Sequence, residues 1–333
     1  MLNENTNDFS ADTPEVATET ASNHMLSGWT AAKTAAFQKE VMGFDHNLKQ
    51  TGLFTDAALI DLLERHPSDM MDVCTMGDAA DPIYPNKFRT GDFRGVPGKT
   101  LLDAAKAGRV WINLRQAMNV HADYKRALDS MYGELSAKTG NRAFNPRGGI
   151  LISSPVARVP YHFDKTETIL WHVRGKKRIY LYPLTQKFIA DSAYEGVISN
   201  ALEDDLPYDS SFDAEAEVID LAEGTALTWP LNSPHRVDNQ SFCVSVTTEY
   251  STRESGMKNA AMLTNATLRT RFGMTPSFTN DGKLTRQVKS VLGRVISKTS
   301  FAPDTTKPDM VTFKIDADAK NFIVDVEPFQ RNF

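Results

Sequence analysis

Between residues 150 and 250, apolar and polar residues alternate in short runs that turn-forming residues interrupt. An alternation with a period of two predicts β-strands. Breaks at Pro155 and at Gly175 separate successive runs. The predicted strands are residues 150–153, 157–163, 167–173, 177–182, 217–221, 226–229, 235–237 and 242–250. Short strands at this density, over roughly 100 residues, favour a closed or double-sheet β-barrel over alternating strand and helix units.

Helical patterns flank the predicted strands on both sides. Thr55 is a capping residue ahead of leucines at helical spacing, and that pattern ends before Pro67. Other predicted helices are 29–44, 101–107, 110–138 with a break near Asn119 and an end at Gly140, an insert at 184–194, 256–271 and 283–298. Residues 75–99 and an acidic segment through 203–205 are predicted to be loops, and residues 311–326 a terminal hairpin.

These patterns predict four parts of the chain. Residues 1–27 carry acidic but no basic side chains and few large apolar ones, so we expect a disordered tail. Residues 28–145 form a helical region that packs on the barrel of residues 146–252. Residues 253–333 supply C-terminal helices and a short hairpin, with a surplus of basic residues up to residue 298. We expect those helices to be a solvated face or a dimerisation region rather than a contact for nucleic acid.

The composition excludes several classes of protein. No apolar run reaches the roughly 18 to 20 residues of a membrane span, and the N-terminus lacks the pattern of a secretory signal. Two cysteines, Cys74 and Cys243, provide neither a disulfide framework nor a zinc cluster. The net charge of −5 argues against a nucleic-acid binder. We therefore expect a cytoplasmic protein in a reducing compartment.

Two residues of one predicted strand, His162 and Asp164, have the spacing of metal ligands. Strand alternation places both side chains on one face, where they would supply two ligands of a 2-His-1-carboxylate iron site. The third ligand is expected on a later strand, and His235 fits because a glycine turn, an apolar strand and a proline-bounded loop precede it. His-x-Asp pairs also arise by chance. His172 is the competing ligand, and we favour a barrel-lining role for it.

Two segments around these residues resemble the JmjC and cupin-like branch of the Fe(II)/2-oxoglutarate oxygenases, especially the small asparaginyl-hydroxylase type. In the first segment, His-x-Asp is followed by a polar residue, an apolar strand, Gly-x-Lys-Arg, a second apolar strand and a proline. In the second segment, a glycine, an apolar strand and a proline precede a histidine and an asparagine four residues later. The matching positions are His162, Asp164, Thr168, Gly175, Lys177, Arg178 and Pro183 in the first, and Gly224, Pro230, His235 and Asn239 in the second.

The resemblance implies a double-stranded β-helix, of the jelly-roll or cupin type, with N-terminal helices and a C-terminal helical segment. It implies Fe(II) held by His162, Asp164 and His235, with 2-oxoglutarate as cosubstrate and dioxygen as oxidant. By position, Lys177 would pair with the distal carboxylate of 2-oxoglutarate, and Thr168 would donate its hydroxyl nearby. One departure is Val159, which stands where relatives carry a hydroxyl residue, and Tyr161 is the candidate to replace that contact.

The function expected from the sequence is therefore hydroxylation, or demethylation by the same chemistry, of an unidentified protein or small molecule. Two alternatives remain open at this point. One is a cupin-like module that binds or assembles without catalysis, and the other is a metal-dependent cupin enzyme that does not use 2-oxoglutarate. A homodimer through the C-terminal helices is one candidate assembly, and neither nucleic acid nor a membrane is expected as a partner.

Overall fold

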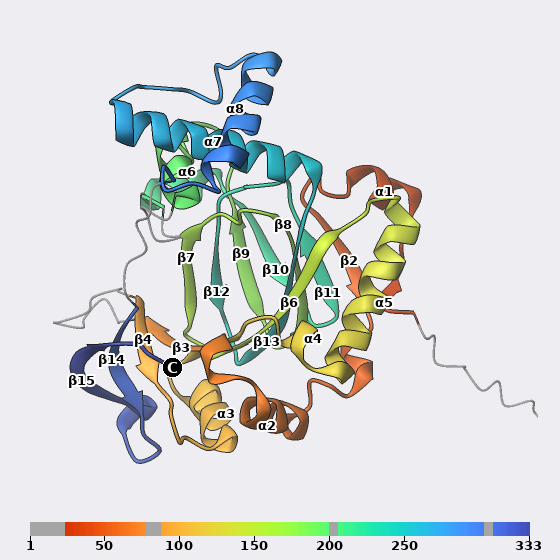
Figure 1. Ribbon diagram of the computed structural model, residues 1–333. Helices are drawn as coiled ribbons and strands as arrows, with labels where there is room; N and C mark the ends of the chain where they lie inside the picture. The colour runs from red at the N-terminus through yellow and green to blue at the C-terminus, as the bar shows by residue number, and fades with distance from the viewer. Residues whose placement is uncertain (1–23, 77–87, 200–205, 303–308) are drawn as a thin grey trace, which may run out of the picture.

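Two β-sheets form the centre of the computed structural model, which describes residues 24–76, 88–199, 206–302 and 309–333 (Figure 1). The prediction of a mainly β protein is confirmed, and the large mixed sheet with its surrounding helices is compatible with a cupin-like core. Of the helices in the described ranges, none is long and apolar enough to cross a membrane. The four-part division of the chain stays a prediction.

The larger sheet has eleven strands and the smaller sheet has four. In order of pairing, the larger sheet runs β1 (Leu26–Ser27), β2 (Met42–His46), β11 (Thr225–Thr228), β8 (Glu167–Arg174), β13 (Cys243–Ser251), β6 (Phe144–Ser153), β5 (Trp111–Leu114), β3 (Met71–Met76), β4 (Phe88–Asp92), β14 (Met310–Ile315) and β15 (Ile323–Gln330). The smaller sheet runs β10 (Glu217–Leu221), β9 (Lys177–Leu181), β12 (His235–Asn239) and β7 (Arg158–His162). Neighbouring strands are antiparallel except β14, which runs parallel to β4.

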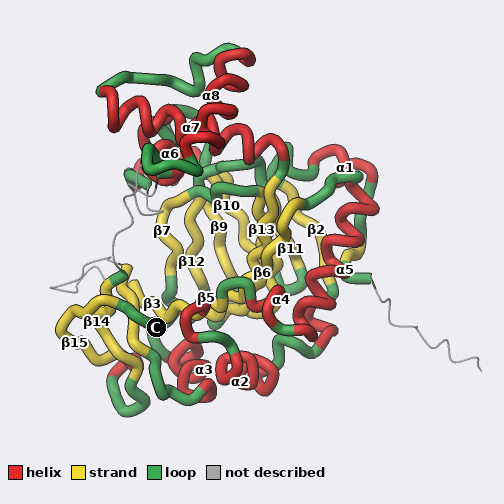
Figure 2. Tube along the Cα trace, in the orientation of Figure 1, coloured by secondary structure: helices red, strands yellow, loops and turns green. Residues whose placement is uncertain are grey.

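The helices lie around the sheets in two groups (Figure 2). The N-terminal group comprises α1 (Ala31–Ala36), α2 (Asp56–Arg65), α3 (Gly98–Ala107), α4 (Ala117–Val120) and α5 (Ala122–Thr139). The second group, at the top of Figure 1, comprises α6 (Asp191–Ile198), α7 (Arg253–Phe272) and α8 (Lys283–Ile296). The apolar side chains of the first group pack against the outer face of the larger sheet, as the cluster that contains Leu59, Leu101 and Trp171 shows.

Two further apolar clusters define the inner and outer faces of the smaller sheet. Leu170 and Leu227 of the larger sheet meet Ile179 and Val237 of the smaller sheet, so the two sheets face each other across an apolar interior. On the opposite face of the smaller sheet, tyrosines and phenylalanines pack under α6 and α7. Alternation along each strand therefore decides which side chains enter the interior, as a period of two requires.

Most of the elements predicted between residues 144 and 298 are confirmed within a few residues. The capped helix at Thr55 is also confirmed, because the Thr55 hydroxyl accepts from the Ala58 amide. The helix predicted to end at Gly140 does so, with a left-handed glycine of φ 71°. The terminal hairpin is confirmed as β14 and β15, although its edge also pairs with β4.

Several predictions on the N-terminal side were wrong. Residues 29–44 and 110–138 are not continuous helices, because they contain β2 and β5, whose alternate side chains are buried. The predicted loop at 75–99 contains β4 and the start of α3, and the insert helix runs over Asp191–Ile198 rather than 184–194. The tail prediction fails at Leu26–Ser27, which pair as β1, and otherwise lies outside the described residues, as does the acidic segment 203–205.

Candidate metal centre

The two predicted histidine ligands lie side by side on neighbouring strands of the smaller sheet. His162 ends β7 and His235 begins β12, and the two residues are direct partners in the antiparallel register. Their ring centroids are 4.2 Å apart. Asp164 lies just beyond β7, in the turn that leads into β8, rather than within a strand. One ligand atom from each of the three residues lies within 4.8 Å of the other two.

Backbone carbonyls fix which nitrogen of each imidazole carries the proton. His162 Nδ1 lies 2.7 Å from the Pro160 carbonyl oxygen, and His235 Nδ1 lies 3.0 Å from the Ser233 carbonyl oxygen. A carbonyl oxygen can only accept, so both Nδ1 atoms carry hydrogen, and in its neutral form each ring presents a bare Nε2 lone pair. This is the arrangement that orients histidine for metal binding through Nε2.

Asp164 completes a set of three acceptors that face one another. His162 Nε2 is 4.0 Å from Asp164 Oδ1 and His235 Nε2 is 3.7 Å from Asp164 Oδ2, which is too far for hydrogen bonds. Asp164 Oδ2 is buried and has no hydrogen-bond partner. A buried oxygen of a carboxylate costs free energy unless a donor or cation compensates it.

A divalent cation would satisfy all three acceptors at once, so these residues fit a metal. Two imidazole nitrogens and one carboxylate oxygen form the donor set that suits Fe(II) among the first-row metals. Burial, followed by the proximity of His162, lowers the pKa of His235 to about 4. His235 is therefore neutral near pH 7 and ready to act as a ligand.

Two helices of the C-terminal half brace the turn that carries Asp164. Asn232, in the left-handed region at φ 66°, donates from Nδ2 to the Asp164 carbonyl oxygen at 2.8 Å. The Tyr194 hydroxyl of α6 lies 3.0 Å from Asn232 Oδ1 and 2.8 Å from Asn259 Oδ1. Asn259 of α7 donates in turn to the carbonyl oxygen of Lys165 at 2.7 Å. Sequence reasoning missed Tyr194 and Asn259, since no motif marks them.

Lys177 lies on the inner face of the smaller sheet, on the same face as the ligands. Leu181, four residues further along the same face of β9, pairs with His235, so Lys177 lies about 13 Å from that pair along the strand at the usual rise. The side chain is buried, at 3% exposure, and Nζ donates to Ser245 Oγ at 2.9 Å. No carboxylate of the described residues pairs with it, and burial lowers its pKa.

The remaining predicted site residues are placed differently. Thr168 is buried on the inner face of β8, where its hydroxyl donates to the Thr166 carbonyl oxygen at 3.3 Å. Tyr161 points away from the interior, because it precedes His162 on the strand, and its hydroxyl donates to the Phe188 carbonyl oxygen at 2.7 Å. The structure therefore does not bring Tyr161 to the three ligands. Val159 packs against the apolar interior although it is two residues before Tyr161, because the pairing of β7 with β12 shifts register between Val159 and His162.

Comparisons with known proteins find distant structural neighbours. No model of a known protein family matches the chain, and no curated protein matches it. A solved structure of YcfD from Escherichia coli is similar at 14% identity and a TM-score of 0.48, over 83% of this chain and 70% of that chain. A structure described as YcfD, a ribosomal oxygenase, with cobalt and 2-oxoglutarate is similar at 13% identity and a TM-score of 0.44, over 80% of this chain and 65% of that chain.

A further YcfD structure, described as a complex with cobalt and succinic acid, is similar at 13% identity and a TM-score of 0.44, over 83% of this chain and 71% of that chain. This structure, too, is described as a ribosomal oxygenase. The likeness to these structures is distant.

Proposed function

We propose that this chain is an Fe(II)- and 2-oxoglutarate-dependent oxygenase with a double-stranded β-helix core, which hydroxylates a protein or small-molecule substrate or demethylates it by the same chemistry. The observation that supports this most is the convergence of two bare Nε2 atoms on the Asp164 carboxylate, whose buried Oδ2 has no hydrogen-bond partner. His162, Asp164 and His235 would hold the iron. Lys177 would hold the distal carboxylate of 2-oxoglutarate, and Thr168 lines the same interior.

The chain's own residues prepare the site for this chemistry. When bound, Fe(II) with 2-oxoglutarate and dioxygen supplies the oxidising power to insert oxygen into a C–H bond. The three ligands would leave other coordination positions free, and the Lys177 ammonium would supply a positive charge to pair with a carboxylate of the cosubstrate. The apolar side chains between the sheets, Leu170 and Ile179 among them, exclude water from the reacting atoms.

The approach of substrate is expected from the side of His162 and Asp164. Their side chains are 18% and 21% exposed, whereas the side chain of His235 is 5% exposed. The site thus opens toward solvent on one side and is closed on the side of β12. A substrate that reaches the ligands over this opening leaves the deeper interior, toward Lys177, to the cosubstrate.

The test is turnover of 2-oxoglutarate by the purified protein with Fe(II) and ascorbate. Succinate formation is expected from the wild type and should be lost in Asp164→Ala and His162→Ala. Tyr161→Phe is the matched control, because it changes one hydroxyl on the outer face of the same strand and should keep full turnover. Equal succinate formation by wild type and Asp164→Ala would overturn the proposal.

A second candidate is a cupin-like module that binds or assembles without catalysis. The observation that favours it is Val159, an apolar residue on the inner face that packs with the cluster between the sheets. This candidate predicts no thermal shift with Mn(II) and 2-oxoglutarate. A metal-dependent cupin enzyme that does not use 2-oxoglutarate predicts instead that Lys177→Ala leaves catalysis unchanged. Cytoplasmic localisation and the lack of a nucleic-acid partner stay predictions.

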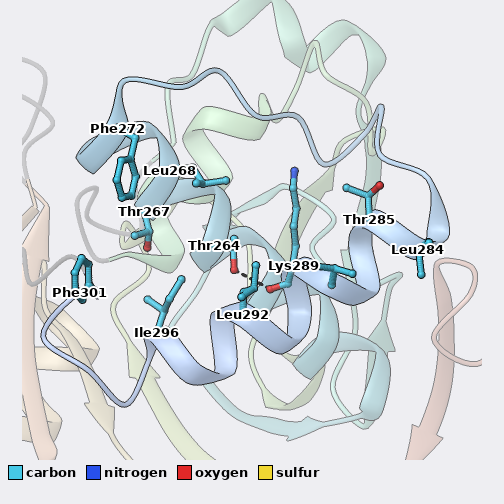
Figure 3. A pocket seen from close by; sticks show the side chains of 11 residues that line it. Thr264, Thr267, Leu268, Phe272, Leu284, Thr285, Lys289, Leu292, Ile296 and Phe301 are labelled. Carbon is cyan, nitrogen blue, oxygen red and sulfur yellow. Dashed lines mark hydrogen bonds between the residues drawn. The ribbon is translucent and has the colours of Figure 1, made fainter.

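We further propose that α8 joins two copies of the chain. Leu284 and Val291 are 74% and 62% exposed, and with Val288 and Val295 they follow the 4-3-4 spacing of a two-stranded coiled-coil seam. Beside this seam, α7 and α8 enclose a groove of about 500 Å³, where Figure 3 shows Leu268, Phe272, Leu292, Ile296 and Phe301 around an open space. Light scattering should give the mass of a dimer, and Leu284→Glu with Val291→Glu that of a monomer.

A further inference from the structure

Three buried polar side chains form a chain of hydrogen bonds across the interior, away from the metal ligands. Lys177 of β9 donates from Nζ to Ser245 Oγ of β13 at 2.9 Å. Ser245 Oγ lies 3.0 Å from His172 Nδ1, on the neighbouring strand β8, and the two residues are partners in the sheet register. Ser245 and His172 have no exposed surface. The chain of bonds therefore connects the smaller sheet to the larger one.

The geometry fixes the direction of every bond in this chain. His172 Nε2 lies 2.9 Å from the Gly175 carbonyl oxygen, which can only accept, so Nε2 carries the proton and Nδ1 is an acceptor. The Ser245 hydroxyl must then donate to Nδ1. Its oxygen is left to accept from the Lys177 ammonium, which has hydrogens and no lone pair.

The turn between β8 and β9 holds the terminal acceptor in place. Gly175 has φ 96°, and a Cβ at this position would come 2.1 Å from the Phe242 carbonyl oxygen. Only glycine therefore allows this turn, which aims the Gly175 carbonyl at the His172 ring. The opposite tautomer of His172 would set an Nε2 lone pair against that carbonyl oxygen at 2.9 Å, where the two acceptors repel.

We propose that His172 is a positioning residue, which acts through Ser245 to orient the Lys177 ammonium toward the distal carboxylate of a bound 2-oxo dicarboxylate. This inference rests on the proposed function. One hydrogen of the ammonium is committed to Ser245, and the other two are directed to the ligand. Without the His172 acceptor, the Ser245 hydroxyl turns its own hydrogen elsewhere and no longer fixes the direction of the ammonium.

The test compares variants that keep or remove the acceptor at the position of Nδ1. In His172→Asn the side-chain oxygen replaces Nδ1, whereas the longer side chain of His172→Gln places its amide at the position of Nε2. With Mn(II) present, calorimetry should show that N-oxalylglycine binds about tenfold more weakly to His172→Gln and to Ser245→Ala, as expected for loss of one charged hydrogen bond. His172→Asn should bind nearly as the wild type does.

Two further measurements separate positioning from a general loss of structure. Thr248→Val removes another buried hydroxyl of β13, one that accepts from Trp171 on the outer face, and should leave N-oxalylglycine binding unchanged. The affinity for 2-oxobutyrate, which lacks the distal carboxylate, should be the same in all these variants. Equal weakening for both ligands, or weakening by His172→Asn as great as that by His172→Gln, would overturn the positioning role.

The tautomer of His172 can be read without any ligand. The ¹⁵N chemical shifts of the His172 ring should show a protonated Nε2 and a bare Nδ1 in the ligand-free protein. A proton on Nδ1 would overturn the inference even if N-oxalylglycine binds to the wild type. If the wild type binds neither Mn(II) nor N-oxalylglycine, the proposed function fails, and the positioning role falls with it.

Discussion

The buried ammonium of Lys177 should lower the stability of the ligand-free protein and raise the affinity for an anion. Burial lowers its pKa, and the side chain has a hydroxyl but no carboxylate partner among the described residues. Replacing a buried charge by an apolar side chain of similar length is often stabilising. We therefore expect Lys177→Met to unfold at a higher temperature than the wild type when no ligand is present.

The size of this effect follows from general magnitudes. Removal of an uncompensated buried charge is expected to stabilise the fold by about 2 kcal/mol. With an unfolding entropy of about 2.1 cal/mol/K per residue, 333 residues give about 0.7 kcal/mol/K. The melting temperature should thus rise by about 3 °C. A ligand at one hundred times its Kd stabilises by about 2.7 kcal/mol, which corresponds to a rise of about 4 °C.

The order of the two proteins should therefore reverse on addition of ligand. In differential scanning fluorimetry with Mn(II), Lys177→Met should melt above the wild type alone and below it with saturating 2-oxoglutarate. Lys289→Met is the matched control. The side chain of Lys289 is also largely hidden from solvent, but its Nζ pairs with Asp281 Oδ2 at 2.6 Å. That variant leaves a carboxylate without its partner and should melt about 2 °C lower, with the ligand shift intact.

Two results would refute this reasoning. If Lys177→Met melts below the wild type without ligand, the ammonium is compensated in the fold and its burial is no argument for an anion site. If Lys177→Met keeps the full shift with 2-oxoglutarate, the cosubstrate is held elsewhere. Either result is independent of whether a substrate for oxidation has been found.

Three other predictions concern acid stability, the brace of the site and the glycine turn. Burial lowers the pKa of His46 from 6.5 to about 4, so the unfolded chain binds more protons within this window, and stability should fall as the pH falls from 6.5 to 4. Urea unfolding should show that the free energy of unfolding falls less steeply with falling pH in His46→Phe than in the wild type. Equal dependence on pH in the two proteins would contradict this. Asn232→Gly keeps the left-handed backbone but loses the bond to Asp164, and should weaken Mn(II) binding about tenfold by calorimetry. Gly175→Ala should lower the free energy of unfolding in urea by about 3 kcal/mol or more. Gly140→Ala, with open space around its Cβ, should lower it by about 1 kcal/mol. Similar losses in the two variants would refute the clash at Gly175.

The strands of the two facing sheets between residues 144 and 251 could be predicted from the sequence because they have one face in an apolar interior. Over residues 167–174, alternate positions lie in two different apolar clusters, Leu170 in one and Trp171 in the other. Alternation also accounts for the inward face that His162 and His235 share, whereas their direct pairing depends on a register shift between β7 and β12. The convergence of His162 and His235 was therefore predictable, whereas Asp164 joins them from a turn beyond β7, and the role of the three residues as metal ligands stays a prediction.

The strands on the N-terminal side could not be recognised because tertiary pairing decides them. Trp111–Leu114 is too short to show a period of its own, and it forms a strand because β3 and β6 supply partners on both sides. Met42–His46 contains a glycine and two buried side chains at alternate positions, and it becomes a strand between β1 and β11. Local propensity does not reveal partners that lie far away along the chain.

The hydrogen bonds that hold the turn at Asp164 could not be predicted from the sequence either, because they depend on single side chains of distant helices. Tyr194 and Asn259 are an ordinary tyrosine and an ordinary asparagine within helices, and neither follows a motif. They contact the turn at Asp164 because α6 and α7 both pack over the outer face of the smaller sheet, where Met262 joins the same cluster as Tyr161. The outward direction of Tyr161, which takes it away from His162, Asp164 and His235, is thus part of what holds those helices beside the site. The position of Asp164 therefore depends on packing at the outer face of the smaller sheet, opposite to the face that carries His162 and His235.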